Sequence, residues 1–130
     1  MKRLLDTNAY VALKRGHVDV AALVRGSVEI TFSMVVIGEL LFGFRNGTQV
    51  EHNTAELELL LASPRVTVLP VTRTTADRFG RIAAMLRKAG TPIPSNDLWI
   101  AAHAFESGAE LLSFDGHFEA VPGLVWTHLS

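Results

Sequence analysis

The stretch MVVIGELLFGF, residues 34–44, contains one charged side chain, Glu39. Its other residues are apolar or glycine on every side of a helical wheel, which predicts a helix buried all round. A carboxylate in such a helix is costly to bury, so it requires a proton, a cationic partner or a metal ion. The middle of a helix offers no capping role. The alternatives to a metal are a protonated carboxyl or a salt bridge to Lys14 or Arg45.

Strands and helices alternate along the chain on both sides of this helix. We expect strands at 2–5, 29–32, 66–69, 110–114 and 125–128. We expect helices at 7–14, 18–24, from Ser33 to an end marked by Gly43 and the Asn46-Gly47 pair, 50–62, from a Thr74/Asp77 capping box to Lys88 and Gly90, and from Ser95 to Gly108. Parallel strands need crossover connections, which helices commonly supply. The alternation therefore predicts an α/β fold whose parallel sheet is covered by helices on both faces.

Composition fits one folded unit over residues 1–130. The chain is 48% hydrophobic and 19% charged, with a formal net charge of -1. This charge gives no global attraction to nucleic acid, so RNA or DNA contacts would need a local cluster of cations. The absence of cysteine excludes a thiolate site and suits a reducing cytoplasm. Asp6 and Asn8 interrupt the apolar run that a signal peptide would need, and no run is long enough to cross a membrane.

Four acids are placed to meet at one edge of the predicted sheet. Asp6 and Asp115 follow strands, Asp97 begins a helix, and Glu39 lies about one and a half turns into another. Ligands of open α/β sheets bind beyond the carboxyl ends of the strands. Four carboxylates held together would repel one another without a cation, and hard oxygen ligands favour Mg²⁺ or Mn²⁺. Taken singly, Asp6 and Asp97 are also ordinary helix-start residues, and Asp115 an ordinary turn residue.

Polar residues accompany the acids at the same predicted edge. They are Thr7, Asn8, Ser33, Asn96 and Ser113. These side chains are candidates to orient ligands, water or a phosphate, although capping and turn formation explain most of them equally well.

The histidine and tryptophans of the apolar segments are expected in the core. His103 lies on an apolar helix, which favours a packed, hydrogen-bonded residue over a metal ligand. Trp99 and Trp126 have apolar neighbours and not basic ones, so we expect packing and not base stacking.

Several segments together resemble a known family. Asp6-Thr7-Asn8, the segment VIGELLFG around Glu39, NDLWIAAHA from Asn96 and LSFDGHF from Leu112 look like a PIN domain, as does Val121-Pro122-Gly123-Leu124. More narrowly, they resemble the VapC-type toxins of bacterial toxin–antitoxin pairs.

The resemblance implies a three-layer α/β/α sandwich with a mainly parallel sheet, a Mg²⁺- or Mn²⁺-dependent endoribonuclease, frequent homodimers and inhibition by a cognate antitoxin. Asp6, Glu39 and Asp97 match the three main acids and Asp115 the fourth. Where some relatives carry another acid or amide, this chain has His117. This residue is either a surface loop residue or a proton donor to the leaving oxygen, and the number of metal ions stays open.

The expected reaction is attack of metal-activated water on an RNA phosphodiester, and the family implies a 5′-phosphate product. Lys14, Arg15, Arg45 and Arg73 are candidate phosphate contacts, with solvated surface charge as the default alternative.

Three alternatives remain at this stage. The first is an RNA-binding or partner-binding module with little turnover, and the second is a DNA-directed nuclease of the same fold. The third is an aspartyl phosphatase, which needs a second Asp where Asn8 stands. The leucine-bearing helix at 50–62, with the helix before it, is a candidate wall of an antitoxin groove or dimer interface, and plain core packing explains it equally well.

Overall fold

Five parallel strands form one sheet. A computed structural model describes residues 1–130. The strands are β1 (Lys2–Leu5), β2 (Glu29–Ser33), β3 (Val66–Leu69), β4 (Glu110–Ser113) and β5 (Trp126–His128), in the order β3-β2-β1-β4-β5. Every neighbouring pair is parallel. The sheet is therefore wholly parallel, as the alternation of elements predicts.

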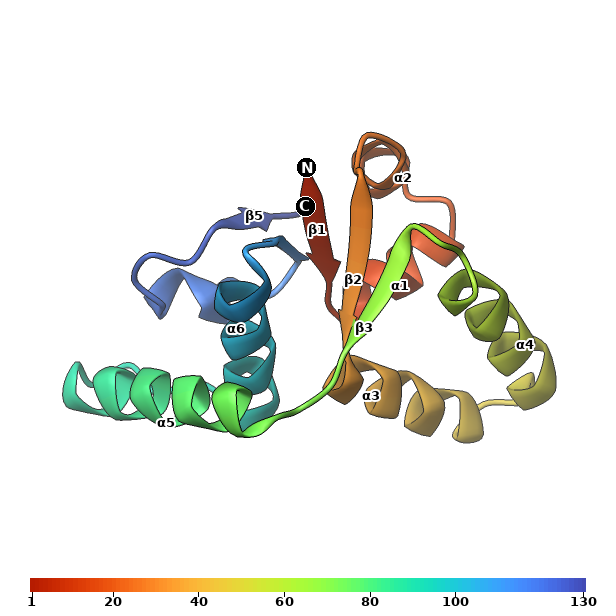
Figure 1. The fold of residues 1–130 in the computed structure, drawn as a ribbon. Coiled ribbons are helices and arrows are strands. Elements are labelled where there is room, and N and C mark those ends of the chain that lie inside the picture. The colour runs from red at the N-terminus through yellow and green to blue at the C-terminus, as the bar shows by residue number, and fades with distance from the viewer.

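Helices cover both faces of this sheet (Figure 1). They are α1 (Thr7–Lys14), α2 (Val18–Arg25), α3 (Met34–Arg45), α4 (Val50–Leu61), α5 (Arg73–Lys88) and α6 (Ser95–Ser107), with a short 3-10 helix η1 (Gly116–Ala120). In Figure 1, α1 to α4 lie to one side of the strands, and α5, α6 and η1 to the other. The three layers of the α/β/α sandwich are present.

The strand order reverses between β1 and β4. The chain passes from β1 outward to β2 and β3, then crosses back to β4 on the other side of β1. Leu5 pairs with Leu112, so both strands end at nearly the same level. The residues that follow these strands, Asp6 and Asp115, therefore reach the switch point where ligands of open α/β sheets bind.

Helix α3 is not buried all round, and that prediction was wrong. Val36, Ile37 and Leu40 face the core, whereas Met34 is 48% and Phe42 68% exposed. The sheet and the neighbouring helices pack on only one side of α3. The apolar residues on every side of α3 did not predict that one face would be exposed, because the burial of a face depends on what packs against it.

The start of α5 also differs from the prediction. Thr72, and not Thr74, is the N-cap, and its hydroxyl oxygen accepts a hydrogen bond from the Thr75 backbone N–H at 3.3 Å. The Thr75 hydroxyl oxygen accepts in turn from the Thr72 N–H at 3.1 Å, which completes the capping box. The box therefore begins two residues earlier than the sequence pattern indicated.

The ends of α6 and α3 test the prediction that a glycine ends each of these helices. Helix α6 ends at Gly108, whose φ of +71° is the left-handed conformation that glycine adopts without strain. Helix α3 runs through Gly43 to Arg45 and is capped by Asn46. Gly43 therefore does not stop the helix. No helix is both long and apolar enough to cross a bilayer.

Candidate metal centre

Ser113 joins the first and fourth acids across the switch point. It ends β4 and is fully buried, and its hydroxyl donates a hydrogen bond to Asp6 Oδ2. The same hydroxyl oxygen accepts from the Asp115 backbone N–H at 2.9 Å. Asp6 caps α1 with its other oxygen, Oδ1, which accepts from the Ala9 N–H at 2.9 Å. The capping role and the cluster role of Asp6 thus use different oxygens.

Glu39 is held by neutral donors and not by a cation. The Thr7 hydroxyl donates to Oε1 at 2.7 Å, and the Asn96 side-chain amide donates to Oε2 at 2.8 Å. The alternative of a salt bridge to Lys14 or Arg45 is wrong, because Glu39 forms no ion pair; Arg45 forms none either, and Lys14 pairs with Glu56 at 3.2 Å. The carboxylate is half-buried. The carboxyl group therefore has no cationic partner in the chain.

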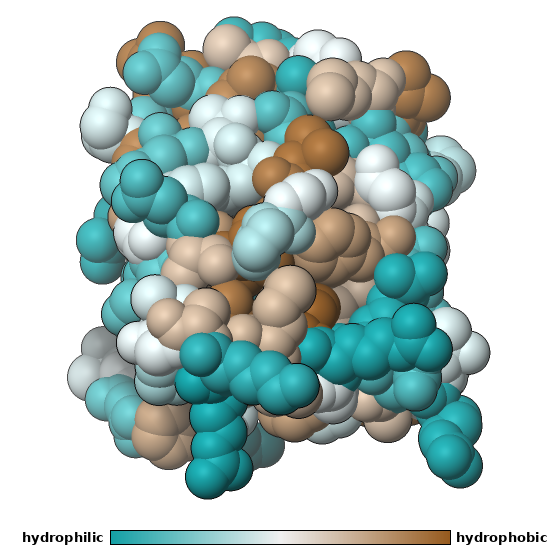
Figure 2. Space-filling view, turned by 90° about the vertical axis from the view of Figure 1, so that its left-hand side faces the viewer, coloured by the Kyte–Doolittle hydropathy of each residue, from teal (hydrophilic) through white to brown (hydrophobic).

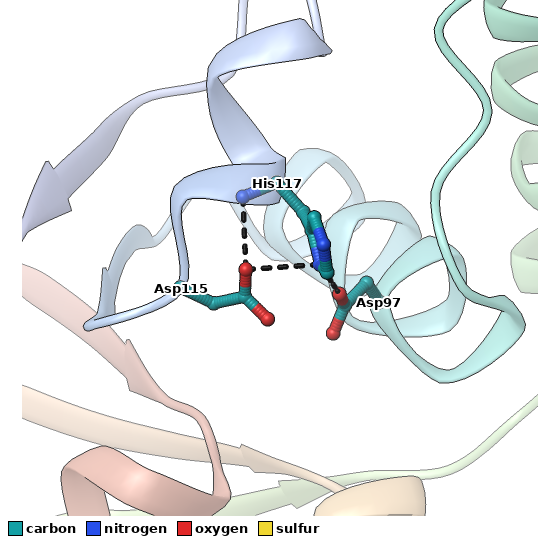
Figure 3. Close-up of side chains that lie close together, drawn as sticks. All are labelled: Asp97, Asp115 and His117. Atoms are coloured by element: carbon teal, nitrogen blue, oxygen red, sulfur yellow. Dashed lines mark hydrogen bonds and ion pairs between the residues drawn. The ribbon is translucent and has the colours of Figure 1, made fainter.

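Asp97, Asp115 and His117 form the tightest part of the cluster (Figure 3). His117 Nδ1 lies 3.1 Å from Asp97 Oδ2 and 2.9 Å from Asp115 Oδ1. The His117 backbone N–H also donates to Asp115 Oδ1 at 2.9 Å, because Asp115 caps the 3-10 helix η1. Their three potential ligand atoms lie within 4.8 Å of one another.

Burial and mutual repulsion disfavour the charged forms of the acids. Burial raises the pKa of Asp6, and the charges of Asp97 and Asp115 raise it further, against the lowering effect of its two hydrogen bonds. Burial likewise raises the pKa of Asp97, with Asp115 and Glu39 adding to the rise and His117 opposing it. The hydrogen bond to Asp97, followed by the charge of Asp115, raises the pKa of His117. The cluster is short of positive charge.

The residues present fit a hard divalent cation. Asp97 and Asp115 lie close enough together to share an ion with His117, whereas Asp6 and Glu39 lie outside that close group. Carboxylate oxygens are the ligands that Mg²⁺ and Mn²⁺ prefer, and no thiolate competes. Asp6 and Asp97 are 7% and 6% exposed, so a bound cation would offset the cost of burying their charges. His117, with half of its side chain exposed, lies at the mouth.

The polar residues proposed beside the acids separate into two groups. Thr7, Asn96 and Ser113 hydrogen-bond an acid of the cluster. Asn8 is exposed on α1 and hydrogen-bonds none of them. Ser33 accepts from the Val35 N–H and bonds His103 Nδ1 at 2.9 Å.

His103 is a core residue, as expected. It is fully buried, and its second ring nitrogen, Nε2, bonds the Pro70 carbonyl at 3.0 Å. Both nitrogens are therefore used within the fold, which leaves none for a metal ion.

A cleft opens beside the cluster between α1, α3 and α4. Its volume is about 410 Å³, and Thr7 and Glu39 line one end. Lys14 and Arg15 line it as well, whereas Arg45 and Arg73 do not. Two of the four candidate phosphate contacts therefore share a cavity with Glu39, the one acid of the cluster that lines it.

Sequence reasoning underestimated His117. A surface loop residue was one expectation, but the turn at Asp115-Gly116 directs the ring back onto two acids. The spacing of an acid and a histidine two residues apart was the available signal. Its meaning depends on the 3-10 geometry, which the sequence pattern did not predict.

The structure is an α/β protein with acidic side chains gathered at the switch point of its parallel sheet, and comparison with known proteins gives the family. The PIN domain model matches residues 3–124. The chain therefore belongs to the PIN-domain family, which confirms the resemblance.

Within this family the chain is similar to VapC ribonucleases. It is 34% identical over 115 residues to Ribonuclease VapC2 of Haemophilus influenzae, covering 87% of this chain and 86% of that protein. The structure of VapBC-1 from nontypeable Haemophilus influenzae matches with a TM-score of 0.84 at 30% identity, over 98% and 97% of the two chains. VapBC2 from Rickettsia felis, solved with a promoter DNA fragment, shares the fold with a TM-score of 0.88 at 24% identity, over the whole of both chains.

Proposed function

We propose that the chain is a Mg²⁺- or Mn²⁺-dependent endoribonuclease and the toxin of a type II toxin–antitoxin pair. The observation that carries this proposal is the acidic cluster at the switch point. Asp97 and Asp115 lie together at His117, Ser113 links Asp6 to Asp115, and Asn96, next to Asp97 in the chain, donates to Glu39. The similarity to VapC ribonucleases supports RNA as the substrate.

The four carboxylates would hold the ion, which when bound supplies an activated water and neutralises charge on the phosphate. Thr7, Asn96 and Ser113 fix the orientation of their acids through the hydrogen bonds described above, so the ligand oxygens need little rearrangement. His117 Nε2 makes no hydrogen bond within the fold and faces away from the Nδ1 contacts. We assign to this nitrogen the proton that the leaving oxygen takes up.

The decisive experiment compares wild type with Asp6→Asn on matched RNA and DNA oligonucleotides in Mg²⁺ and Mn²⁺. Asparagine also caps helices, so the variant keeps α1 while removing a charged ligand. We expect RNA cleavage with 5′-phosphate products, and a loss of about 100-fold or more in the variant. Equal activity of the two proteins, or cleavage of DNA alone, contradicts the proposal. Equal inactivity on several RNAs favours a binding module.

We further propose that a cognate antitoxin segment occupies the cleft between α1, α3 and α4. Tyr10, Val11 and Phe44 give it apolar walls, which suits an amphipathic segment, and Glu39 at one end can receive an arginine of that segment. The solved complex VapBC-1 supports an assembly of this kind, and we expect a homodimer of the toxin as well. Growth arrest on expression of the chain alone, relieved by co-expression of a small neighbouring gene, tests this part.

A further inference from the structure

Helix α5 concentrates positive charge in a chain whose net charge is -1. Five of its sixteen residues are cationic and one, Asp77, is acidic. The cations are Arg73, Arg78, Arg81, Arg87 and Lys88. Only Arg81 forms an ion pair, with Asp77 at 3.0 Å, and that pair is exposed. The remaining four are available to an anionic partner.

Two adjoining hollows connect this helix to the metal centre. One contains Gly116 and His117, and the other contains Leu86, Arg87 and Leu98. Both are lined by Pro92 and Ile93, so the loop between α5 and α6 forms their common floor. Figure 2 shows this side of the molecule, with apolar surface at its centre and long hydrophilic side chains along its lower border, the level of α5 in Figure 1.

We propose that a single-stranded RNA runs from the metal centre over Pro92 and Ile93 to the last turn of α5, where Arg87 and Lys88 bind its phosphates. The acids of the centre repel a polyanion, so affinity for the rest of the strand must come from cations outside it. The hollow offers a base the apolar surface of Pro92 and Ile93, and the cations beside it follow the backbone.

Charge and continuity favour RNA over a protein occupant on this face. Glu119 is the one acid among the residues that line the two hollows, and it is exposed on η1, opposite α5. The path begins at His117, which contacts two of the acids that the proposed function places at the scissile phosphate. The inference therefore rests on the proposed function and names the surface that holds the substrate.

The test compares Arg87→Ala with Arg25→Ala. Arg25 is exposed, ends α2 in the same way that Arg87 lies in the last turn of α5, and lies on the other face of the sheet. Anisotropy of a labelled single-stranded RNA of about twelve nucleotides, titrated in Ca²⁺ at several salt concentrations, measures binding. For Arg87→Ala we expect affinity to fall about three- to tenfold and the salt slope to fall by about 1.

A second readout locates the strand on wild type. RNA carrying 4-thiouridine should crosslink within residues 86–93, and Arg87→Ala should raise KM for cleavage while leaving kcat near that of wild type. Wild-type cleavage with identical behaviour of the two variants, or crosslinks on other faces only, overturns this inference and leaves the proposed function intact. An altered sedimentation of Arg87→Ala without altered RNA binding overturns it in favour of a protein interface. No RNA binding or cleavage by wild type overturns both.

Discussion

Neutral hydrogen-bond donors hold two of the four acids and leave their charge in place. Thr7 and Asn96 donate to Glu39, and Ser113 donates to Asp6. A lysine or arginine in these positions would neutralise the carboxylates and compete with a metal ion. A hydroxyl or amide fixes the orientation of a carboxylate without neutralising its charge. Ser113 is the most connected of these residues, because it also accepts from the Asp115 backbone.

Ser113→Ala should therefore disturb both ends of the switch point. The loss of one hydrogen bond that lowers the pKa of Asp6 raises that pKa further, and the Asp115 N–H loses its acceptor. We expect about 10- to 100-fold weaker metal affinity or activity. Calorimetric titration with Mn²⁺ measures the metal affinity, and an RNA cleavage assay measures the activity.

Ser63→Ala is the matched control, since its hydroxyl serves only the Arg65 N–H in a loop before β3. If both serine variants bind Mn²⁺ as wild type does, Ser113 has no part in orienting the acids.

At the scale of elements, local sequence signals such as capping residues and glycines predicted most of the helix and strand boundaries. The long helix α6 began at Ser95 and ended before Gly108 as expected, because a left-handed glycine is a local property of the sequence. Exposure of α3 and the contact of His117 with two acids were not predictable in this way. The exposure of α3 and the contact of His117 with Asp97 depend on neighbours distant in the chain, and the contact with Asp115 depends on the 3-10 geometry of η1; local patterns encode neither.

The position of the N-cap of α5, which the sequence pattern placed at Thr74 and the structure places at Thr72, can be tested by mutation. Thr72→Ala removes the hydroxyl that accepts from Thr75, and we expect the free energy of unfolding to fall by about 0.5–2 kcal/mol. Thr74→Ala changes the residue that the sequence pattern favoured, which is exposed and makes no side-chain hydrogen bond. Its effect should lie within about 0.5 kcal/mol of zero.

Urea unfolding of the two threonine variants measures both effects. A larger loss for Thr74→Ala than for Thr72→Ala would place the cap where the sequence pattern had it.

At the scale of the whole molecule, the acids of the candidate metal centre link the stability of the fold to pH. Asp6 and Asp97 have raised pKa values in the fold, so the folded chain binds their protons more tightly than the unfolded chain does. The stability of the metal-free fold therefore rises as pH falls through the raised values toward the ordinary value of 3.8. His117 acts in the same direction, because its contribution is fully present below pH 6.5 and is lost as pH rises through its raised pKa.

Divalent metal should reverse this trend. At roughly 100 times its Kd, Mn²⁺ should add about 2.7 kcal/mol to the free energy of unfolding, and the gain should shrink on acidification because protons compete for Asp6 and Asp97. Thermal melts with and without Mn²⁺ at a series of pH values measure this gain in stability. Asp97→Asn should lose most of the gain, and a gain that is independent of pH would argue against these acids as ligands.

The four acids stand at positions 6, 39, 97 and 115 of a chain of 130 residues, and Ser113 joins the first of them to the last. Under the proposed function, the metal centre therefore cannot assemble in a nascent chain until Asp115 has been synthesised and the Ser113 hydroxyl has met Asp6.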